Sequence, residues 1–193
     1  MVLIGMLCLK VGVMKTMLDK SKSSHLIWIT GLINSGKTSL SNALAENLRI
    51  HGKHVTLVEG DSVAEINLIE NSENDYSISG RTQRTIKAAK LCKLLMQGNT
   101  IVIGSFVGGM FKGVDEWLTA NVESKFTVFL NPPLDVLAKR DTKGLYGKQE
   151  FIPGIDQQVD IPDYDLELDS STESVEVLVE KIIKEVGLFL NKK

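Results

Sequence analysis

The chain has 193 residues, of which 43% are hydrophobic and 24% are charged, and its formal net charge is -2. These values are typical of one compact globular domain with a sizeable core. The small net charge offers no basic surface for a nucleic acid or an anionic membrane, so we expect neither partner. The two cysteines, Cys8 and Cys92, lie far apart without histidines at metal-ligand spacing, which argues against a zinc site or a disulfide framework and favours the cytoplasm.

Residues 1–24 are expected to form an N-terminal extension ahead of the first strand. The run 1–14 is apolar, but it is too short to cross a bilayer and has no small-residue cleavage pattern. Residues 25–193 contain no internal repeat and no linker. We therefore expect them to form a single domain.

Apolar runs and helical periodicity alternate along this domain. Short apolar runs predict strands, and apolar residues spaced by three or four predict helices. Their alternation predicts an α/β fold, a five-stranded parallel sheet with helices on both faces, and a ligand site beyond the carboxyl ends of the strands. In chain order we expect strand 26–30, helix 38–50, strand 54–58, helix 81–97, strand 100–104, helix 111–121, strand 126–130, a helix starting at Pro133, strand 164–168 and a helix from Glu173.

The segment GLINSGKT, residues 31–38, matches the pattern GxxxxGK[ST] between the first predicted strand and helix. The glycines let backbone amides surround phosphates, and the helix N-terminus adds a favourable dipole. Lys37 is expected to reach the β- and γ-phosphates of ATP, and the Thr38 hydroxyl to bind Mg²⁺. A chance match is the alternative, and the strand and helix context weakens it. We therefore expect a P-loop NTPase-type domain that binds ATP through Gly31, Asn34, Ser35, Gly36, Lys37, Thr38 and Ser39.

An acidic residue, Asp61, follows the second predicted strand at the same edge of the sheet. Asp61 can orient and deprotonate an acceptor hydroxyl and help to hold Mg²⁺. An isolated acid after a strand is otherwise a solvated turn or a helix cap. Beside a P-loop, the pattern favours a kinase in which Lys37 and Asp61 are catalytic.

The run from Arg140 to Lys148 places three cations around two glycines, at the start of a stretch without clear periodicity. Such a segment suits a mobile flap over a polyphosphate. A helix C-terminus with terminal cations and a glycine stop explains the same spacing. Both interpretations remain open, and we expect a lid over about 141–163.

From residue 26 to the final helix the chain resembles the adenylylsulfate kinase family. The shared motifs occur in the family's order: the P-loop, Gly60-Asp61, Ser105-Phe106, Pro133-Leu134, RDTKGLY at 140–146, and Gly154-Ile155-Asp156. The resemblance implies MgATP-dependent phosphorylation of the ribose 3′-hydroxyl of adenosine 5′-phosphosulfate, a small nucleotide acceptor, by a homodimer. By position it implies Asp61 as the catalytic acid, Arg140 near the ATP base, and acceptor contacts from Tyr76, Arg81, Phe106, Lys143, Leu145 and either Phe151 or Ile152.

Departures from the family pattern lie on the acceptor side. Ala64 stands where the family has an arginine, Arg84 where it has an asparagine, and Gly108-Gly109 where it has Ser-Pro. These changes indicate another acceptor, such as a cytidine diphosphate carrying a phosphoramidate, or they are compensated by cations from Arg84 and Lys112. Arg84 is therefore a further candidate for acceptor binding.

A protein of another class also fits part of the pattern. A non-catalytic module that binds ATP needs Lys37 and Thr38 but has no use for Asp61. The sequence thus leaves open a kinase of adenosine 5′-phosphosulfate, a kinase of a related nucleotide, and an ATP-binding module.

Overall fold

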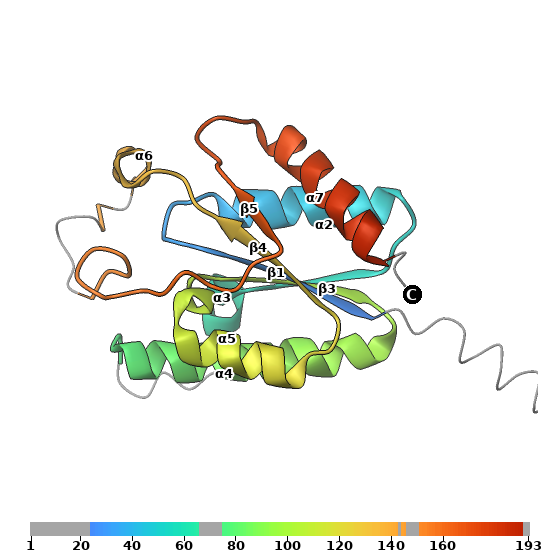
Figure 1. Ribbon diagram of the computed structural model, residues 1–193, viewed down its shortest axis with the longest axis horizontal. Helices are drawn as coiled ribbons and strands as arrows, with labels where there is room; N and C mark the ends of the chain where they lie inside the picture. The colour runs from blue at the N-terminus through green and yellow to red at the C-terminus, as the bar shows by residue number, and fades with distance from the viewer. Residues whose placement is uncertain (1–23, 66–74, 143, 146–150, 191–193) are drawn as a thin grey trace, which may run out of the picture.

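The computed structural model describes residues 24–65, 75–142, 144–145 and 151–190 (Figure 1). The expected N-terminal extension up to residue 23 and residues 143 and 146–150 of the expected lid lie outside this range. In the labels of Figure 1, the elements are β1 (His25–Gly31), α2 (Lys37–Ile50), β2 (Val55–Glu59), α3 (Gly60–Glu65), α4 (Ile78–Leu95), η1 (Met96–Gly98), β3 (Ile101–Phe106), η2 (Val107–Met110), α5 (Lys112–Asn121), β4 (Lys125–Leu130), α6 (Leu134–Lys139), β5 (Leu166–Leu168) and α7 (Val175–Leu190).

The strands form one parallel sheet in the order β2-β3-β1-β4-β5, which confirms the predicted fold class. β1 lies in the centre and pairs with β3 on one side and β4 on the other. With both edges paired and both faces covered, every residue of β1 is buried. This position explains why its sequence is a continuous apolar run rather than an alternating one.

Helices cover both faces of the sheet, with α2 and α7 on one face and α3, α4 and α5 on the other (Figure 1). Side chains of β1 alternate between the two layers because successive strand residues point to opposite faces. Ile27 and Ile29 pack with α2 and α7, whereas Leu26 and Trp28 pack with α4 and α5. Two apolar cores therefore hold β1, and with it the loop that follows, from both sides.

The helix boundaries differ from the sequence expectation near the second strand. α3 was not predicted, because six residues are too few for a helical period to be recognised. α4 begins at Ile78, three residues earlier than expected, since the Ser77 hydroxyl accepts the Gly80 N–H at 3.1 Å and caps the helix there. In the described part of the chain, no helix is long and apolar enough to span a bilayer.

Candidate active site

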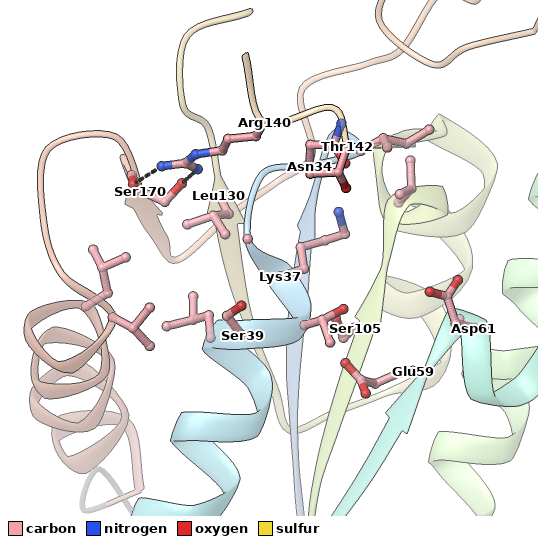
Figure 2. Close-up of a pocket in the computed structure, with 18 of the residues that line it drawn as sticks. Asn34, Lys37, Ser39, Glu59, Asp61, Ser105, Leu130, Arg140, Thr142 and Ser170 are labelled. Carbon is pink, nitrogen blue, oxygen red and sulfur yellow. Dashed lines mark hydrogen bonds between the residues drawn. The ribbon is translucent and has the colours of Figure 1, made fainter. Parts of the chain in front are cut away.

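A cavity of about 670 Å³ opens beyond the carboxyl ends of the strands (Figure 2). Its walls come from the P-loop and the first turn of α2, the ends of β2, β3 and β4, and the first turns of α7. This is the edge at which open parallel sheets bind ligands, as predicted from the strand and helix alternation.

Glycines shape the P-loop at both of its ends. A Cβ on Gly31 would overlap the backbone oxygen of Leu130, so only glycine lets the chain leave β1 here. At the other end, Gly36 has a φ of 94° and Asn34 a φ of 64°, which are left-handed values. The chain therefore turns tightly before α2 begins at Lys37, with Gly36, Thr38 and Ser39 lining the cavity.

Lys37 also lines the cavity and is held by the loop itself. Its Nζ donates to the backbone oxygen of Leu32 at 2.7 Å and to Oγ of Ser35 at 3.4 Å. Burial lowers the pKa of Lys37 to about 8, and the negative charge of Asp61 opposes this shift. The ammonium is thus poorly hydrated, a setting in which polyphosphate oxygens bind it strongly.

Two carboxylates, Asp61 and Glu59, stand on the opposite wall of the cavity (Figure 2). Asp61 is exposed in the first turn of α3, and Glu59 ends β2, with its Oε1 accepting the Ser41 hydroxyl at 3.0 Å. With the Thr38 hydroxyl these are hard oxygen donors, which suit Mg²⁺ together with phosphate oxygens. Among the described residues no three acidic, histidine or cysteine side chains converge on a metal position, so an ion here would depend on the nucleotide.

The side of the cavity where the ATP base is expected, here called the base side, is formed by Arg140 and the start of α7. Arg140 donates from Nη1 to the Ser170 hydroxyl at 2.9 Å and from Nη2 to the Ser170 backbone oxygen at 2.7 Å. Leu130, Val175 and Leu178 add an apolar wall that suits a flat base. Arg140 was predicted here from the sequence and Ser170 was not, although Ser170 follows β5 at the same edge of the sheet.

The predicted acceptor residues come together around Arg81, which lines the cavity, and we call this group the rim: Tyr76, Arg81, Arg84 and Phe151. Arg81 donates from Nε to the Tyr76 backbone oxygen at 3.1 Å and from Nη2 to the Phe151 backbone oxygen at 3.0 Å. The Tyr76 and Phe151 side chains are each 49% exposed, and the guanidiniums of Arg81 and Arg84 lie 5.2 and 5.9 Å from the Tyr76 ring centre. Burial, and then the charge of Arg84, lower the pKa of Arg81, so this rim is a partly desolvated cationic surface with aromatic faces.

The remaining acceptor predictions do not share one location. Phe106 is only 6% exposed and stacks on Trp28 with ring centres 4.9 Å apart, because its strand position points into the core. We therefore assign no acceptor contact to the Phe106 ring. Leu145 lines the cavity, Ile152 is buried beside the exposed Phe151, and Lys143 lies outside the described residues.

Because Gly108 and Gly109 have no Cβ, neighbouring elements can pack closely against η2. A Cβ on Gly108 would overlap the hydroxyl of Thr85 on α4, and a Cβ on Gly109 would lie 2.5 Å from Nε1 of Trp28. Thr85 is buried and donates to the backbone oxygen of Arg81 at 2.9 Å. Gly108 thus allows α4 to pack close to η2 at the turn that carries Arg81, and Gly109 allows η2 to pack close to β1.

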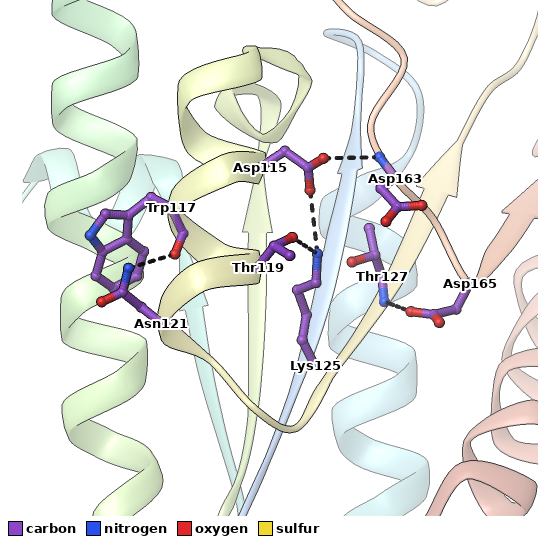
Figure 3. Close-up of polar contacts among 8 residues, drawn as sticks. All are labelled: Asp115, Trp117, Thr119, Asn121, Lys125, Thr127, Asp163 and Asp165. Atoms are coloured by element: carbon purple, nitrogen blue, oxygen red, sulfur yellow. Dashed lines mark hydrogen bonds and ion pairs between the residues drawn. The ribbon is translucent and has the colours of Figure 1, made fainter.

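The chain returns from the expected lid towards β5 along α5 and β4 (Figure 3). The backbone N–H of Asp163 donates to Oδ2 of Asp115 at 3.2 Å, and Oδ1 of Asp115 pairs with Nζ of Lys125 at 3.3 Å. The Asp165 carboxylate accepts the N–H of Thr127 at 2.7 Å. Polar contacts therefore fix the end of this segment to the sheet.

Comparisons with known proteins agree with this architecture. Residues 23–169 match the family described as adenylylsulphate kinase. The chain is 31% identical over 170 residues to the cytidine diphosphoramidate kinase of Campylobacter jejuni, a match that covers 85% of this chain and 97% of that protein. It is 33% identical over 150 residues to the adenylyl-sulfate kinase of Bacillus velezensis, covering 75% of this chain and 74% of the relative.

A solved structure shares the same fold. The APS kinase CysC of Mycobacterium tuberculosis, in complex with AMPPNP and APS, superimposes with a TM-score of 0.75 at 23% identity, covering 85% of this chain and 98% of that one. Since the family match spans more than half of the sequence and its P-loop, Gly60-Asp61 and Arg140 motifs meet at one cavity, the chain belongs to the adenylylsulphate kinase family of phosphotransferases that act on a hydroxyl group.

Proposed function

We propose that this kinase transfers the γ-phosphate of ATP to a ribose hydroxyl of a small nucleotide, with adenosine 5′-phosphosulfate as the first candidate acceptor and 3′-phosphoadenosine 5′-phosphosulfate as the product. The observation that carries the proposal is the shared cavity of Lys37, Asp61 and Arg81. A donor site and an acceptor site on one cavity are what direct phosphoryl transfer requires.

In the proposed mechanism each of these residues has a positioning or electrostatic role. Lys37 and the loop amides hold the triphosphate, and Asp61 orients the acceptor hydroxyl and takes its proton. Tyr76 and Phe151 offer faces on which the acceptor base stacks, while Arg81 binds its anionic group. Thr38, with Asp61 or Glu59, would hold Mg²⁺, which neutralises charge on the transferring phosphoryl group.

The second candidate acceptor is cytidine diphosphoramidate. It is supported by the similarity to the Campylobacter jejuni kinase and by the changed positions 64, 84, 108 and 109. Arg84 places a second guanidinium beside Arg81 over the Tyr76 ring, so the anion site is not that of the family pattern. Stacking on Tyr76 and Phe151 accepts either base, because every base has a π-face.

A competition assay separates the two acceptors. The purified chain is given MgATP and equal concentrations of both nucleotides, and the phosphorylated products are quantified by mass spectrometry. Turnover of the phosphosulfate alone would support the first candidate, and turnover of the phosphoramidate alone the second. Hydrolysis of ATP without phosphorylation of either nucleotide would contradict both.

We also infer from the family resemblance that the chain works as a homodimer. Light scattering of the eluted protein measures its mass directly. A mass of twice the 21.3 kDa chain is expected, and a mass equal to one chain would contradict this inference.

A further inference from the structure

The hydroxyl of Ser170 lies between the base side of the cavity and the P-loop (Figure 2). It accepts a hydrogen bond from Nη1 of Arg140 at 2.9 Å and donates one to the backbone oxygen of Ser35 at 2.7 Å. Nη2 of Arg140 donates to the backbone oxygen of the same serine. These hydrogen bonds join the end of α6, the loop after β5 and the P-loop.

The hydrogen bond to Ser35 fixes the orientation of one peptide plane. A trans peptide is planar, and its N–H points away from its C=O. The plane that carries the Ser35 oxygen also carries the N–H of Gly36, a residue that lines the cavity. By holding the oxygen on its own side, the Ser170 hydroxyl directs the Gly36 N–H to the opposite side of the loop.

The orientation of this peptide plane depends on a hydrogen bond from outside the loop because the residue that follows the plane is a glycine. Gly36 has a φ of 94°, and glycine reaches positive and negative φ with similar ease, so the plane can turn when nothing retains it. The Arg140 charge polarises the Ser170 hydroxyl. When the C=O of a peptide group accepts a strong hydrogen bond, the N–H of the same peptide group becomes a better donor. A cation on the base side therefore acts on an amide of the phosphate-binding loop.

We propose that Ser170 is a positioning residue for the phosphate donor, which couples Arg140 on the base side to the Gly36 amide of the P-loop. The inference rests on the proposed function in that it takes ATP as the donor. It has one consequence that simple base stacking by Arg140 does not have. Loss of Arg140 weakens the binding of polyphosphates that carry no base.

A double-mutant cycle tests this coupling by calorimetry with the Mg²⁺ complexes of ATP and of inorganic triphosphate. Ser170→Ala should weaken both ligands by about fivefold to tenfold, the effect of one neutral hydrogen bond. Arg140→Ala should weaken triphosphate by a similar factor, and adding it to Ser170→Ala should cause little further loss. Ser170→Thr keeps the hydroxyl and should restore binding, while the exposed neighbour Ser171→Ala is the matched control.

A spectroscopic signal separates coupling from general loss of structure. Ser170→Ala should shift the amide resonance of Gly36, and leave the amide resonances of α4 unchanged. Unchanged triphosphate affinity in Arg140→Ala, or losses that add in the double variant, would overturn the proposal. Because neither readout requires an acceptor, a chain that phosphorylates neither candidate nucleotide still gives a decisive result here.

Discussion

At the scale of single residues, a change at Asp61 distinguishes a kinase from a non-catalytic ATP-binding module, because only the kinase needs this carboxylate. Asp61 is exposed and lines the cavity, so Asp61→Asn removes a charge without disturbing packing. We expect turnover to fall at least about 100-fold, because positioned proton transfer contributes that much, while ATP binding stays within about twofold of the original chain. Steady-state rates and calorimetric titration with ATP measure the two quantities.

The control for this change is Glu65→Gln, which neutralises another exposed carboxylate of α3. Its turnover should match that of the unmodified chain. Full activity in Asp61→Asn would instead mean that another group, with Glu59 the nearest candidate, takes the proton.

Lys37 gives the second prediction at this scale, a pH dependence of ATP binding. Burial lowers its pKa from 10.5 to about 8, whereas bound phosphates favour the charged ammonium. ATP binding should therefore take up protons above pH 8, and the affinity should fall as pH rises through that value. Calorimetry in two buffers of different ionisation heat, at pH values on either side of 8, measures the proton uptake.

The lowered pKa of Lys37 also affects the free energy of unfolding of the chain without ligand. Between pH 8 and 10.5 the unfolded chain binds more protons at Lys37 than the folded chain does, so the contribution of Lys37 to the free energy of unfolding rises across this window. Lys37→Arg stays charged throughout and should abolish both effects. Proton uptake that persists in Lys37→Arg would assign it to another group.

At the scale of elements, the contact between η2 and α4 depends on Gly108. Its Cβ would overlap Thr85, a β-branched residue that cannot move away easily. We expect Gly108→Ala to lower the free energy of unfolding by about 1–3 kcal/mol, as overpacking does, and to raise the KM for the acceptor, because Arg81 lies one turn away from Thr85. Urea unfolding and acceptor kinetics provide the measurements.

Two further variants test the cause of this loss. Gly108→Ala combined with Thr85→Ala should cost less than the sum of the single changes. The shortest contact, to the Thr85 hydroxyl, is then removed, and only the contact with the Cβ of residue 85 at 2.7 Å remains. Gly98→Ala, where no atom lies within 4 Å of the added Cβ, should leave acceptor kinetics unchanged. Strict additivity of the first pair would contradict a steric origin.

The ion pair that holds the end of the expected lid segment is the other element-scale feature. Lys125 and Asp115 are only 12% and 23% exposed, so Asp115→Asn leaves a poorly hydrated cation without its carboxylate. The free energy of unfolding should fall by about 1–3 kcal/mol. Asp135→Asn breaks a pair whose members, Lys139 and Asp135, are 77% and 66% exposed, and should leave the free energy of unfolding nearly unchanged because water screens the pair. Equal losses from both changes in urea unfolding would contradict the expectation that the less exposed pair stabilises the fold more than the exposed one.

At the scale of the whole molecule, the sequence predicted the parts that local patterns determine. The strand, glycine loop and helix around Lys37 lie within about 25 consecutive residues, so their order and the loop were visible without a structure. The Ser170–Ser35 bond joins residues 135 apart, and nothing in the local sequence pairs them. The packing of Gly108 against Thr85 likewise depends on how α4 meets the sheet, so the sequence showed the unusual glycines but not their reason.

Phe106 illustrates the limit of transferring a role by position. Its place in the motif order is that of the family, yet its ring is one of the core side chains that pack on Trp28. A motif fixes where the backbone of a residue lies, whereas the neighbours from other elements decide where its side chain is accommodated. Arg140 and Arg81 do line the cavity, and their roles there stay predictions.

The proposed ATP site is formed by segments from both ends of the described chain, which predicts how ligand binding affects global stability. Lys37 follows β1, Arg140 follows α6, and Ser170 precedes α7, so ATP would contact segments that are brought together only in the folded chain. At 100 times its Kd, a ligand that binds only the folded state adds about 2.7 kcal/mol to the free energy of unfolding. For a chain of this length that corresponds to a rise in Tm of about 5–10 °C. Thermal unfolding with and without MgATP measures the shift, and Lys37→Ala should reduce it strongly. A Tm that does not respond to saturating MgATP would mean that this cavity is not where ATP binds.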